Sequence, residues 1–120
     1  MDTEPHLRKF QKELAVGTVA LLLLSVLGRS AAPMYGYEIA KHLGDGGQAS
    51  PAGKQSALYP VLRSLHAGGL LDSHVEPSVS GPPRRYYAIT EMGRAVLREW
   101  IQTWRTTRAF VDDIISGSSS

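Results

Sequence analysis

Residues 54–71 have the sequence KQSALYPVLRSLHAGGLL, and this stretch decides the fold. Its leucine and valine side chains recur at helical spacing, which predicts a helix over residues 54–67 that ends at the pair Gly68-Gly69. Pro60 lies inside this helix. Because proline is tolerated in a first turn, we expect the helix either to begin late or to be irregular there.

Residues 71–90 follow with the sequence LDSHVEPSVSGPPRRYYAIT. Residues 71–76 alternate between apolar and polar, and residues 85–89 are rich in aromatic and apolar side chains, so both segments are predicted to be strands. Residues 77–83 join them and contain too much proline to pair in a sheet. The stretch therefore predicts a helix followed by a two-stranded hairpin.

Two further helices are predicted upstream. The first is expected over residues 7–27, buried on most sides and capped at its end by Gly28. The second is expected to begin at Pro33 and to end at Gly44, with a glycine-rich loop after it. Three helices followed by a hairpin are typical of a winged helix-turn-helix, in which the third helix enters the DNA major groove. The predicted fold class is mainly α with a small β-hairpin.

A long final helix is predicted after Thr90, which is a suitable N-cap. It would be about 25 residues and ~37 Å long. A globule of ~100 residues has a radius of gyration of only ~13 Å, so the domain cannot cover the apolar stripe along this helix. A homodimer is the commonest way to cover such a surface. The predicted dimerisation residues lie on the first and last helices: Leu21, Leu24, Val96, Ile101, Val111 and Ile115.

The basic residues are unevenly distributed, although the net charge of the 120-residue chain is only +2. Residues 46–71 carry Lys54 and Arg63 without an acid, and residues 77–90 carry Arg84 and Arg85 without an acid. Two acid-free basic segments fit a surface that binds a polyanion. Arg outnumbers Lys nine to four, which favours planar, bidentate partners such as phosphate.

Other classes of protein find little support. The chain has no Cys, which excludes disulfides and thiolate metal sites, and its four His residues lack the spacing of metal ligands. No nucleophile elbow or phosphate loop frames a catalytic residue. We therefore expect no enzyme, no metal and no cofactor.

The uncharged run over residues 14–28 raises the question of a membrane or secretion signal. Fifteen residues are fewer than the ~20 that a spanning helix needs. A signal peptide is the stronger alternative, because basic residues precede the run and Ser30-Ala31-Ala32 follows it, but acidic residues in the same N-terminal region oppose it. We expect a cytoplasmic protein without a membrane partner.

Four blocks of sequence together resemble the PadR family of bacterial transcription regulators. The resemblance extends over about residues 14–97, and its blocks are Met34-Tyr35-Gly36-Tyr37-Glu38-Ile39, Leu58-Tyr59-Pro60-Val61-Leu62-Arg63-Ser64-Leu65, Gly69-Leu70-Leu71 and Pro83-Arg84-Arg85-Tyr86-Tyr87-Ala88-Ile89-Thr90 with Gly93. It implies a dimeric winged-helix DNA-binding protein, usually a repressor, whose N- and C-terminal helices form the dimer interface. The single long C-terminal helix resembles the short branch of that family.

One departure from the family concerns the start of the third helix. The family often has Gly-Thr before Leu-Tyr-Pro, whereas this chain has Ser56-Ala57, so the hydroxyl at the second position is missing. Ser56 offers a hydroxyl one residue earlier.

The predicted DNA-binding residues combine hydrogen-bond donors and positive charge around the third helix and the wing. Gln55 is the candidate base reader, since Gln can bond adenine in a bidentate way. Arg84 and Arg85 can sit in a minor groove or pair with phosphate, and we expect only one of them to face DNA because neighbouring strand residues point to opposite sides. The full set is Tyr37, Lys54, Gln55, Ser56, Tyr59, Arg63, Arg84 and Arg85. Solvated charges and half-buried tyrosines are the structural alternative.

Trp100 and Trp104 are four residues apart on the final helix, so their indoles are expected to stack along one face. In a dimer they could line a cavity for a flat aromatic effector, as in some members of the family that the sequence resembles. The alternative is that both simply fill the dimer core.

Taken together, the residues predict three segments: a DNA-binding winged helix over residues 1–90, a dimerisation helix over residues 91–115 and a disordered tail over residues 116–120. The predicted function is sequence-specific binding of double-stranded DNA, as a repressor relieved by a small effector. A winged helix that binds a protein partner instead of DNA is the alternative, because fold does not determine function.

Overall fold

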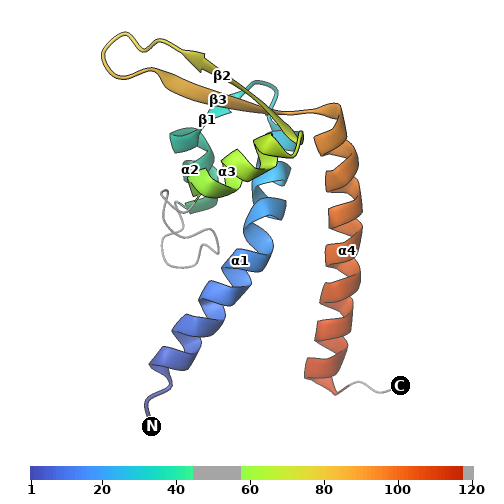
Figure 1. Ribbon diagram of the computed structural model, residues 1–120. Helices are drawn as coiled ribbons and strands as arrows, with labels where there is room; N and C mark the ends of the chain where they lie inside the picture. The colour runs from blue at the N-terminus through green and yellow to red at the C-terminus, as the bar shows by residue number, and fades with distance from the viewer. Residues whose placement is uncertain (45–57, 118–120) are drawn as a thin grey trace.

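The computed structural model describes residues 1–44 and 58–117, which form helices around a small sheet (Figure 1). Along the chain the elements are α1 (Glu4–Arg29), β1 (Met34–Tyr35), α2 (Gly36–Gly44), α3 (Leu58–Ala67), β2 (Leu71–Glu76), β3 (Arg84–Ile89) and α4 (Glu91–Ser116). The mainly helical winged helix-turn-helix predicted from the sequence is confirmed, with a sheet larger than the expected hairpin.

The core lies where the C-terminal half of α1 meets α3 and the sheet. Its buried side chains are all apolar apart from one tyrosine hydroxyl, so hydrophobic burial is what holds these elements together. The core consists of Leu23, Leu24 and Leu27 of α1, Leu58, Leu62 and Leu65 of α3, and Met34, Ile39, Leu71 and Tyr87. Leu24, predicted as a dimerisation residue, is 0% exposed in the single chain. It belongs to the core and leaves no side-chain surface for a partner, so the prediction for this residue is wrong.

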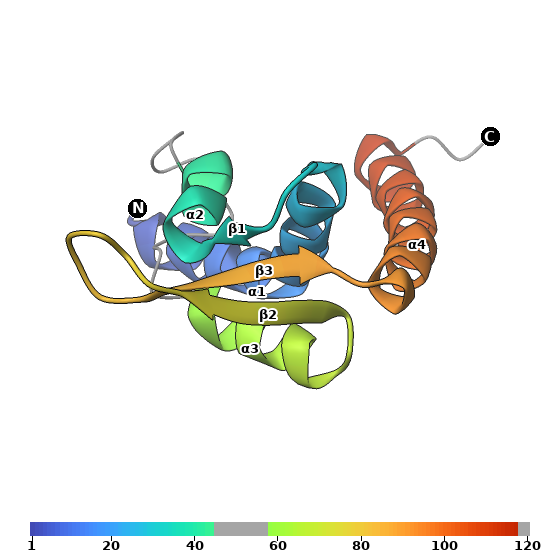
Figure 2. The ribbon, with the colours of Figure 1, turned by 90° about the horizontal axis from the view of Figure 1, so that it is seen from above.

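The sheet has three antiparallel strands in the order β1-β3-β2, so β3 is central (Figure 2). Met34 pairs with Tyr87, and Leu71 pairs with Ile89 at the base of the hairpin. The sequence prediction missed β1 and started α2 too early, at Pro33 instead of Gly36. The partner of Met34 lies 53 residues away in sequence, from 34 to 87, so local periodicity carries no sign of this strand.

Gly28 does not end the first helix, contrary to the prediction. It lies inside α1, which continues to Arg29 and is capped by the Ser30 backbone N–H donating to the Leu27 carbonyl. A Cβ at Gly28 would lie 3.1 Å from Cδ2 of Leu97 in α4. The glycine thus accommodates a crossing helix, and not a helix end.

The predicted N-cap of the last helix is confirmed. The Thr90 side-chain oxygen accepts a hydrogen bond from the Gly93 backbone N–H at 2.9 Å. From there α4 extends for 26 residues through Ser116, one residue beyond the predicted end. Residues 118–120 of the predicted tail lie outside the described residues.

The N-terminal half of α1 and the C-terminal half of α4 project away from the sheet (Figure 1). The molecule measures 57 × 37 × 22 Å with a radius of gyration of 16.7 Å, above the ~14 Å expected for a globule of this length. The expectation that α1 is buried on most sides is therefore wrong for the single chain. Only Leu23, Leu24 and Leu27 of α1 are buried.

By length and composition, α1 could also cross a bilayer, because the helix has 26 residues instead of the fifteen-residue uncharged run considered from the sequence. Its C-terminal half, however, supplies three leucines to the core, which ties the helix to the winged-helix domain.

Candidate nucleic-acid interface

Helix α3 separates a buried face from a polar one. Leu58, Leu62 and Leu65 point into the core, whereas Tyr59 and Arg63, four residues apart, are exposed on the same side of the helix. Pro60 lies in the first turn of the helix as described, where its missing N–H costs no hydrogen bond. The helix thus presents a tyrosine and an arginine outward from a rigid base.

The end of α3 follows the prediction. The helix stops at Ala67, and Gly69 adopts a φ of 82°, a left-handed conformation that glycine reaches without strain. The turn sends the chain directly into β2, so the wing is attached to α3 through a short connection.

Tyr59 packs against the start of α2. A Cβ at Gly36 would lie 2.7 Å from Cε1 and 2.8 Å from the hydroxyl of Tyr59, so only glycine allows the ring to occupy this place. The Met34-Tyr35-Gly36-Tyr37 block therefore positions a side chain of the predicted DNA-binding helix.

A hollow of about 370 Å³ lies between α3 and the wing. Its lining has three arginines and no acidic residue, and consists of Tyr35, Gly36, Tyr59, Arg63, Pro83, Arg84, Arg85 and Tyr87. Among the described residues, none of the three arginines takes part in an ion pair. Four of the predicted DNA-binding residues, Tyr59, Arg63, Arg84 and Arg85, thus border one positively charged hollow.

Arg84 and Arg85 use their side chains differently, as the alternation of a strand predicts. The guanidinium carbon of Arg84 lies 4.5 Å from the centre of the Tyr35 ring. Arg85 Nη1 donates a 2.6 Å hydrogen bond to Ser73 Oγ on the neighbouring strand. Both border the hollow, and that only one of them faces DNA stays a prediction.

Tyr37 is 51% exposed at the start of α2. Its ring centre lies 6.3 Å from that of Tyr35, and Lys41 Nζ lies 5.9 Å from it. The predicted residues Lys54, Gln55 and Ser56 lie outside the described residues.

The sequence interpretation missed Tyr35, which lines the hollow and contacts Arg84. Tyr35 belongs to the block that carries the family resemblance, but its role depends on β1, whose pairing with β3 was not predicted.

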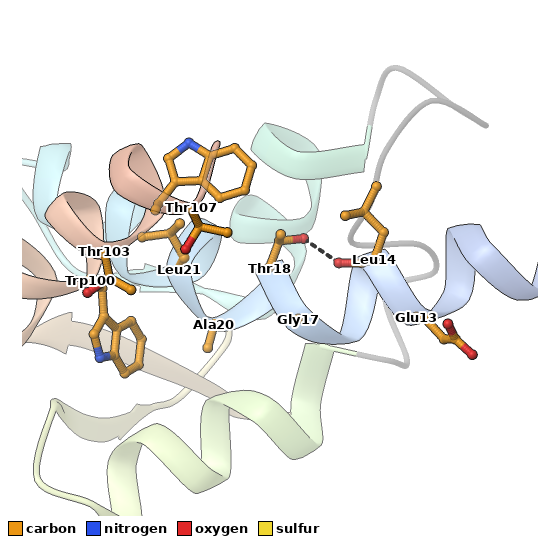
Figure 3. Close-up of a pocket in the computed structure, with 10 residues that line it drawn as sticks. Glu13, Leu14, Gly17, Thr18, Ala20, Leu21, Trp100, Thr103 and Thr107 are labelled. Atoms are coloured by element: carbon orange, nitrogen blue, oxygen red, sulfur yellow. Dashed lines mark hydrogen bonds between the residues drawn. The ribbon is translucent and has the colours of Figure 1, made fainter. Parts of the chain in front are cut away.

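A second cleft of about 490 Å³ separates α1 from α4 (Figure 3). It is mostly apolar. Its lining comes from two helices: from α1, Glu13, Leu14, Gly17, Thr18, Ala20 and Leu21, and from α4, Trp100, Thr103, Trp104 and Thr107. The Thr18 hydroxyl donates to the Leu14 carbonyl of its own helix.

Both predicted effector residues line this cleft, but the expected stacking of their rings is not observed. The ring contacts recorded within the described part of the chain involve Tyr35, Tyr37, Tyr86 and His74, and neither tryptophan. Trp100 is half-buried against the core, and Trp104 is 39% exposed. Their four-residue spacing brings them to one cleft without bringing their rings together.

The remaining predicted dimerisation residues form a gradient of exposure along the helices. Leu21, Val96 and Ile101 are half-buried, whereas Val111 and Ile115 near the end of α4 are exposed.

Within the described ranges, no group of three or more potential metal ligands is found.

The described elements, with a helix-turn-helix order and a wing beside an arginine-lined hollow, define a winged-helix protein. Residues 23–99 match the model of the transcriptional regulator PadR-like family. The chain belongs to this family, a family of DNA-binding transcriptional regulators, as the sequence resemblance predicted.

Solved structures agree with this assignment. A PadR family transcriptional regulator from Eggerthella lenta is 35% identical, with a TM-score of 0.79, 93% of this chain covered and 94% of the other. A PadR-like transcriptional regulator from Bacillus cereus is 26% identical, with a TM-score of 0.69 and coverage of 86% and 96%. A PadR family transcription regulator from Clostridium difficile is 27% identical, with a TM-score of 0.66 and coverage of 82% and 98%.

Proposed function

We propose that the protein binds double-stranded DNA in a sequence-specific way as a homodimer, and represses transcription until a small aromatic effector releases it. The observation that carries DNA binding is the hollow between α3 and the wing, where Arg63, Arg84 and Arg85 gather without an acidic neighbour in its lining. Three guanidinium groups that form no ion pair with any described residue surround one concave surface. They suit a DNA phosphate, which accepts bidentate hydrogen bonds from arginine.

The remaining predicted residues keep the roles that the sequence suggests. Helix α3 enters the major groove; Gln55 reads a base, and Lys54 and Ser56, which also precede the helix in the sequence, contact the backbone. The hydroxyls of Tyr37 and Tyr59 donate to phosphate. The wing arginines extend these contacts toward the adjacent groove.

Dimerisation is supported by the apolar surface that the single chain leaves in water. Phe110, Val111, Ile114 and Ile115 of α4 are between 44% and 77% exposed, and Leu7, Phe10 and Leu14 of α1 are between 47% and 60% exposed. Exposed side chains in such numbers mark an interaction surface. A second copy offers the same helices and closes the surface by two-fold symmetry, which also matches the two half-sites of an operator.

The cleft between α1 and α4 is the proposed effector site. Its apolar lining with a few threonine hydroxyls suits a flat aromatic molecule of drug-like size. Filling of the cleft by the partner subunit is the competing role for Trp100 and Trp104.

Tryptophan fluorescence separates these two roles. A panel of planar cationic and phenolic compounds should quench the wild type saturably, and Trp100→Phe and Trp104→Phe should each weaken the binding. Unsaturable quenching throughout the panel, or binding that survives both substitutions, would assign the tryptophans to packing.

The proposal includes a cytoplasmic location, since the DNA target lies there, and no catalytic activity, metal, cofactor or membrane partner. Repression follows from the usual behaviour that the family resemblance implies.

Selection of DNA from a random duplex library by the purified protein tests the proposal. The selected duplex should bind with an affinity that falls steeply as salt rises, with a slope of about −0.9 for each phosphate contacted. Failure to enrich any sequence, together with weak binding that salt does not change, would favour the alternative function as a protein-interaction module.

A further inference from the structure

Arg84 is not paired with the acid that the sheet places beside it. The register sets Arg84 directly opposite Glu76 on β2, where an arginine and a glutamate commonly form a cross-strand ion pair. In the structure Glu76 Oε2 instead lies 2.9 Å from His74 Nε2. The Arg84 guanidinium carbon lies 4.5 Å from the centre of the Tyr35 ring.

Tyr35, which contacts Arg84, and His74, which contacts Glu76, belong to one row of rings on the outer face of the sheet. Tyr35 pairs with Tyr86 in the register, and their ring centres are 5.4 Å apart. His74 is also opposite Tyr86 and stacks on it at 5.5 Å with an interplanar angle of 12°. Tyr86 thus has a ring on each side. The Tyr35 ring contacts the Arg84 guanidinium, and the His74 ring contacts the Glu76 carboxylate.

We propose that Tyr35 and His74 are positioning residues that keep Arg84 and Glu76 apart, so that the Arg84 guanidinium stays available for a DNA phosphate. The inference rests on the proposed DNA-binding function and adds the means by which one of its arginines is presented.

The physical basis is a competition between contacts of similar strength. An exposed ion pair and an exposed cation–π contact stabilise by comparable amounts, so the neighbouring ring is sufficient to decide which one forms. Contact with the face of a ring leaves the in-plane N–H donors of a guanidinium free, whereas a bidentate pair with a carboxylate uses two of them. The ring contact therefore preserves the donors that phosphate needs.

Substitution of Tyr35 tests the inference. Tyr35→Leu removes the ring, and the freed Arg84 should pair with Glu76; affinity for the duplex selected by the wild type should fall roughly threefold to fivefold. Tyr35→Phe keeps a ring and should bind within about twofold of the wild type. Circular dichroism and thermal melting establish that both variants are folded.

Glu76→Gln supplies the reversal. In the Tyr35→Leu background it removes the competing carboxylate and should restore most of the lost affinity, whereas in the wild type it should improve binding only slightly. His74→Ala releases Glu76 and should weaken binding in the same direction, and Glu76→Gln should again compensate. This non-additivity is what a shared network produces, and a purely structural role of Tyr35 would not produce it.

An NMR measurement without DNA reports on the contact directly. The side-chain protons of Arg84 should be shifted upfield by the Tyr35 ring in the wild type and in Tyr35→Phe, but not in Tyr35→Leu. This readout also distinguishes the two proposals. A wild type without the upfield shift, or a folded Tyr35→Leu that keeps full DNA affinity while Arg84→Ala loses it, overturns the inference and leaves DNA binding intact. A wild type that binds no DNA overturns both.

Discussion

The α3–wing face and the projecting ends of α1 and α4 both have the features of an interaction surface, but their chemistry is opposite. At the α3–wing hollow, three arginines lie without ion-pair partners among the described residues. On the projecting helices, large apolar side chains such as Phe110 and Ile115 stand 66% and 77% exposed. The first surface suits an anionic partner, and the second suits another apolar surface.

The two faces should respond differently to salt. Contacts to phosphate release counterions and weaken with salt, whereas apolar association is strengthened or unchanged by it. High salt should therefore remove DNA from the protein and leave the dimer intact.

Charges placed on the apolar face should have the largest consequence. Val111→Asp with Ile115→Asp would put unpaired carboxylates into the dimer interface, at a cost of roughly 3–5 kcal/mol for each buried charge. Analytical ultracentrifugation should show monomers or unfolded chains in place of dimers. Gln102→Asp with Ala109→Asp is the matched control, because it adds the same charges on the opposite side of α4. A wild type that is a folded monomer at micromolar concentration would refute the dimer.

Removal of the wing charges should have the next largest effect. Arg84→Ala with Arg85→Ala should weaken binding to every DNA sequence and reduce the salt slope by up to about 2 units. Titrations at several salt concentrations measure both quantities. Arg98→Ala with Arg105→Ala removes two charges from α4 and should change the slope little. An unchanged slope in the wing variant would rule out the wing as a DNA contact.

Gln55→Ala should affect specificity more than overall affinity. Loss of a bidentate amide contact removes about 1–3 kcal/mol of discrimination at one base pair, while the phosphate contacts remain. Binding to a set of single-base variants of the selected duplex should show relaxed preference at one position. Uniform weakening at all positions would instead assign Gln55 to the backbone.

Gly36→Ala should give the smallest effect, confined to one side chain. The new methyl group would displace the Tyr59 ring and cost one contact, about 1 kcal/mol of DNA affinity, with little change in thermal stability. Gly68→Ala is the control, since its nearest neighbour would lie at an ordinary 3.5 Å. Equal DNA affinities of Gly36→Ala and the wild type would show that the place of Tyr59 does not matter.

Much of this architecture could be predicted from local sequence. The strand over 71–76 was predicted with its observed bounds, and the end of α3 at Ala67 followed from Gly68-Gly69. These elements depend on the alternation and turn chemistry of neighbouring residues, which a sequence displays directly. The same applies to the clustering of Arg84 and Arg85 beside the wing turn.

Other features required contacts between distant segments. Gly28 resembles a helix end until Leu97 is seen packed beside it, and Leu24 resembles an interface residue until the core is assembled around it. The strand β1 is two residues long and exists only because β3 pairs with it. None of these leaves a periodic signal, because each depends on other segments of the chain; the partner of Gly28 lies 69 residues away in sequence and that of Met34 lies 53 residues away.

The sequence by itself determined the order of helices and strands, the family, and which residues carry positive charge, because periodicity, caps and composition are local properties. Tertiary structure was needed to show that Arg63 and the wing arginines share one hollow, that Arg84 lies over the Tyr35 ring, and that the two tryptophans line one cleft. These contacts join segments that are distant in the sequence. They form only when the core packs, because the free energy that stabilises them comes from the whole core and not from any single stretch of chain.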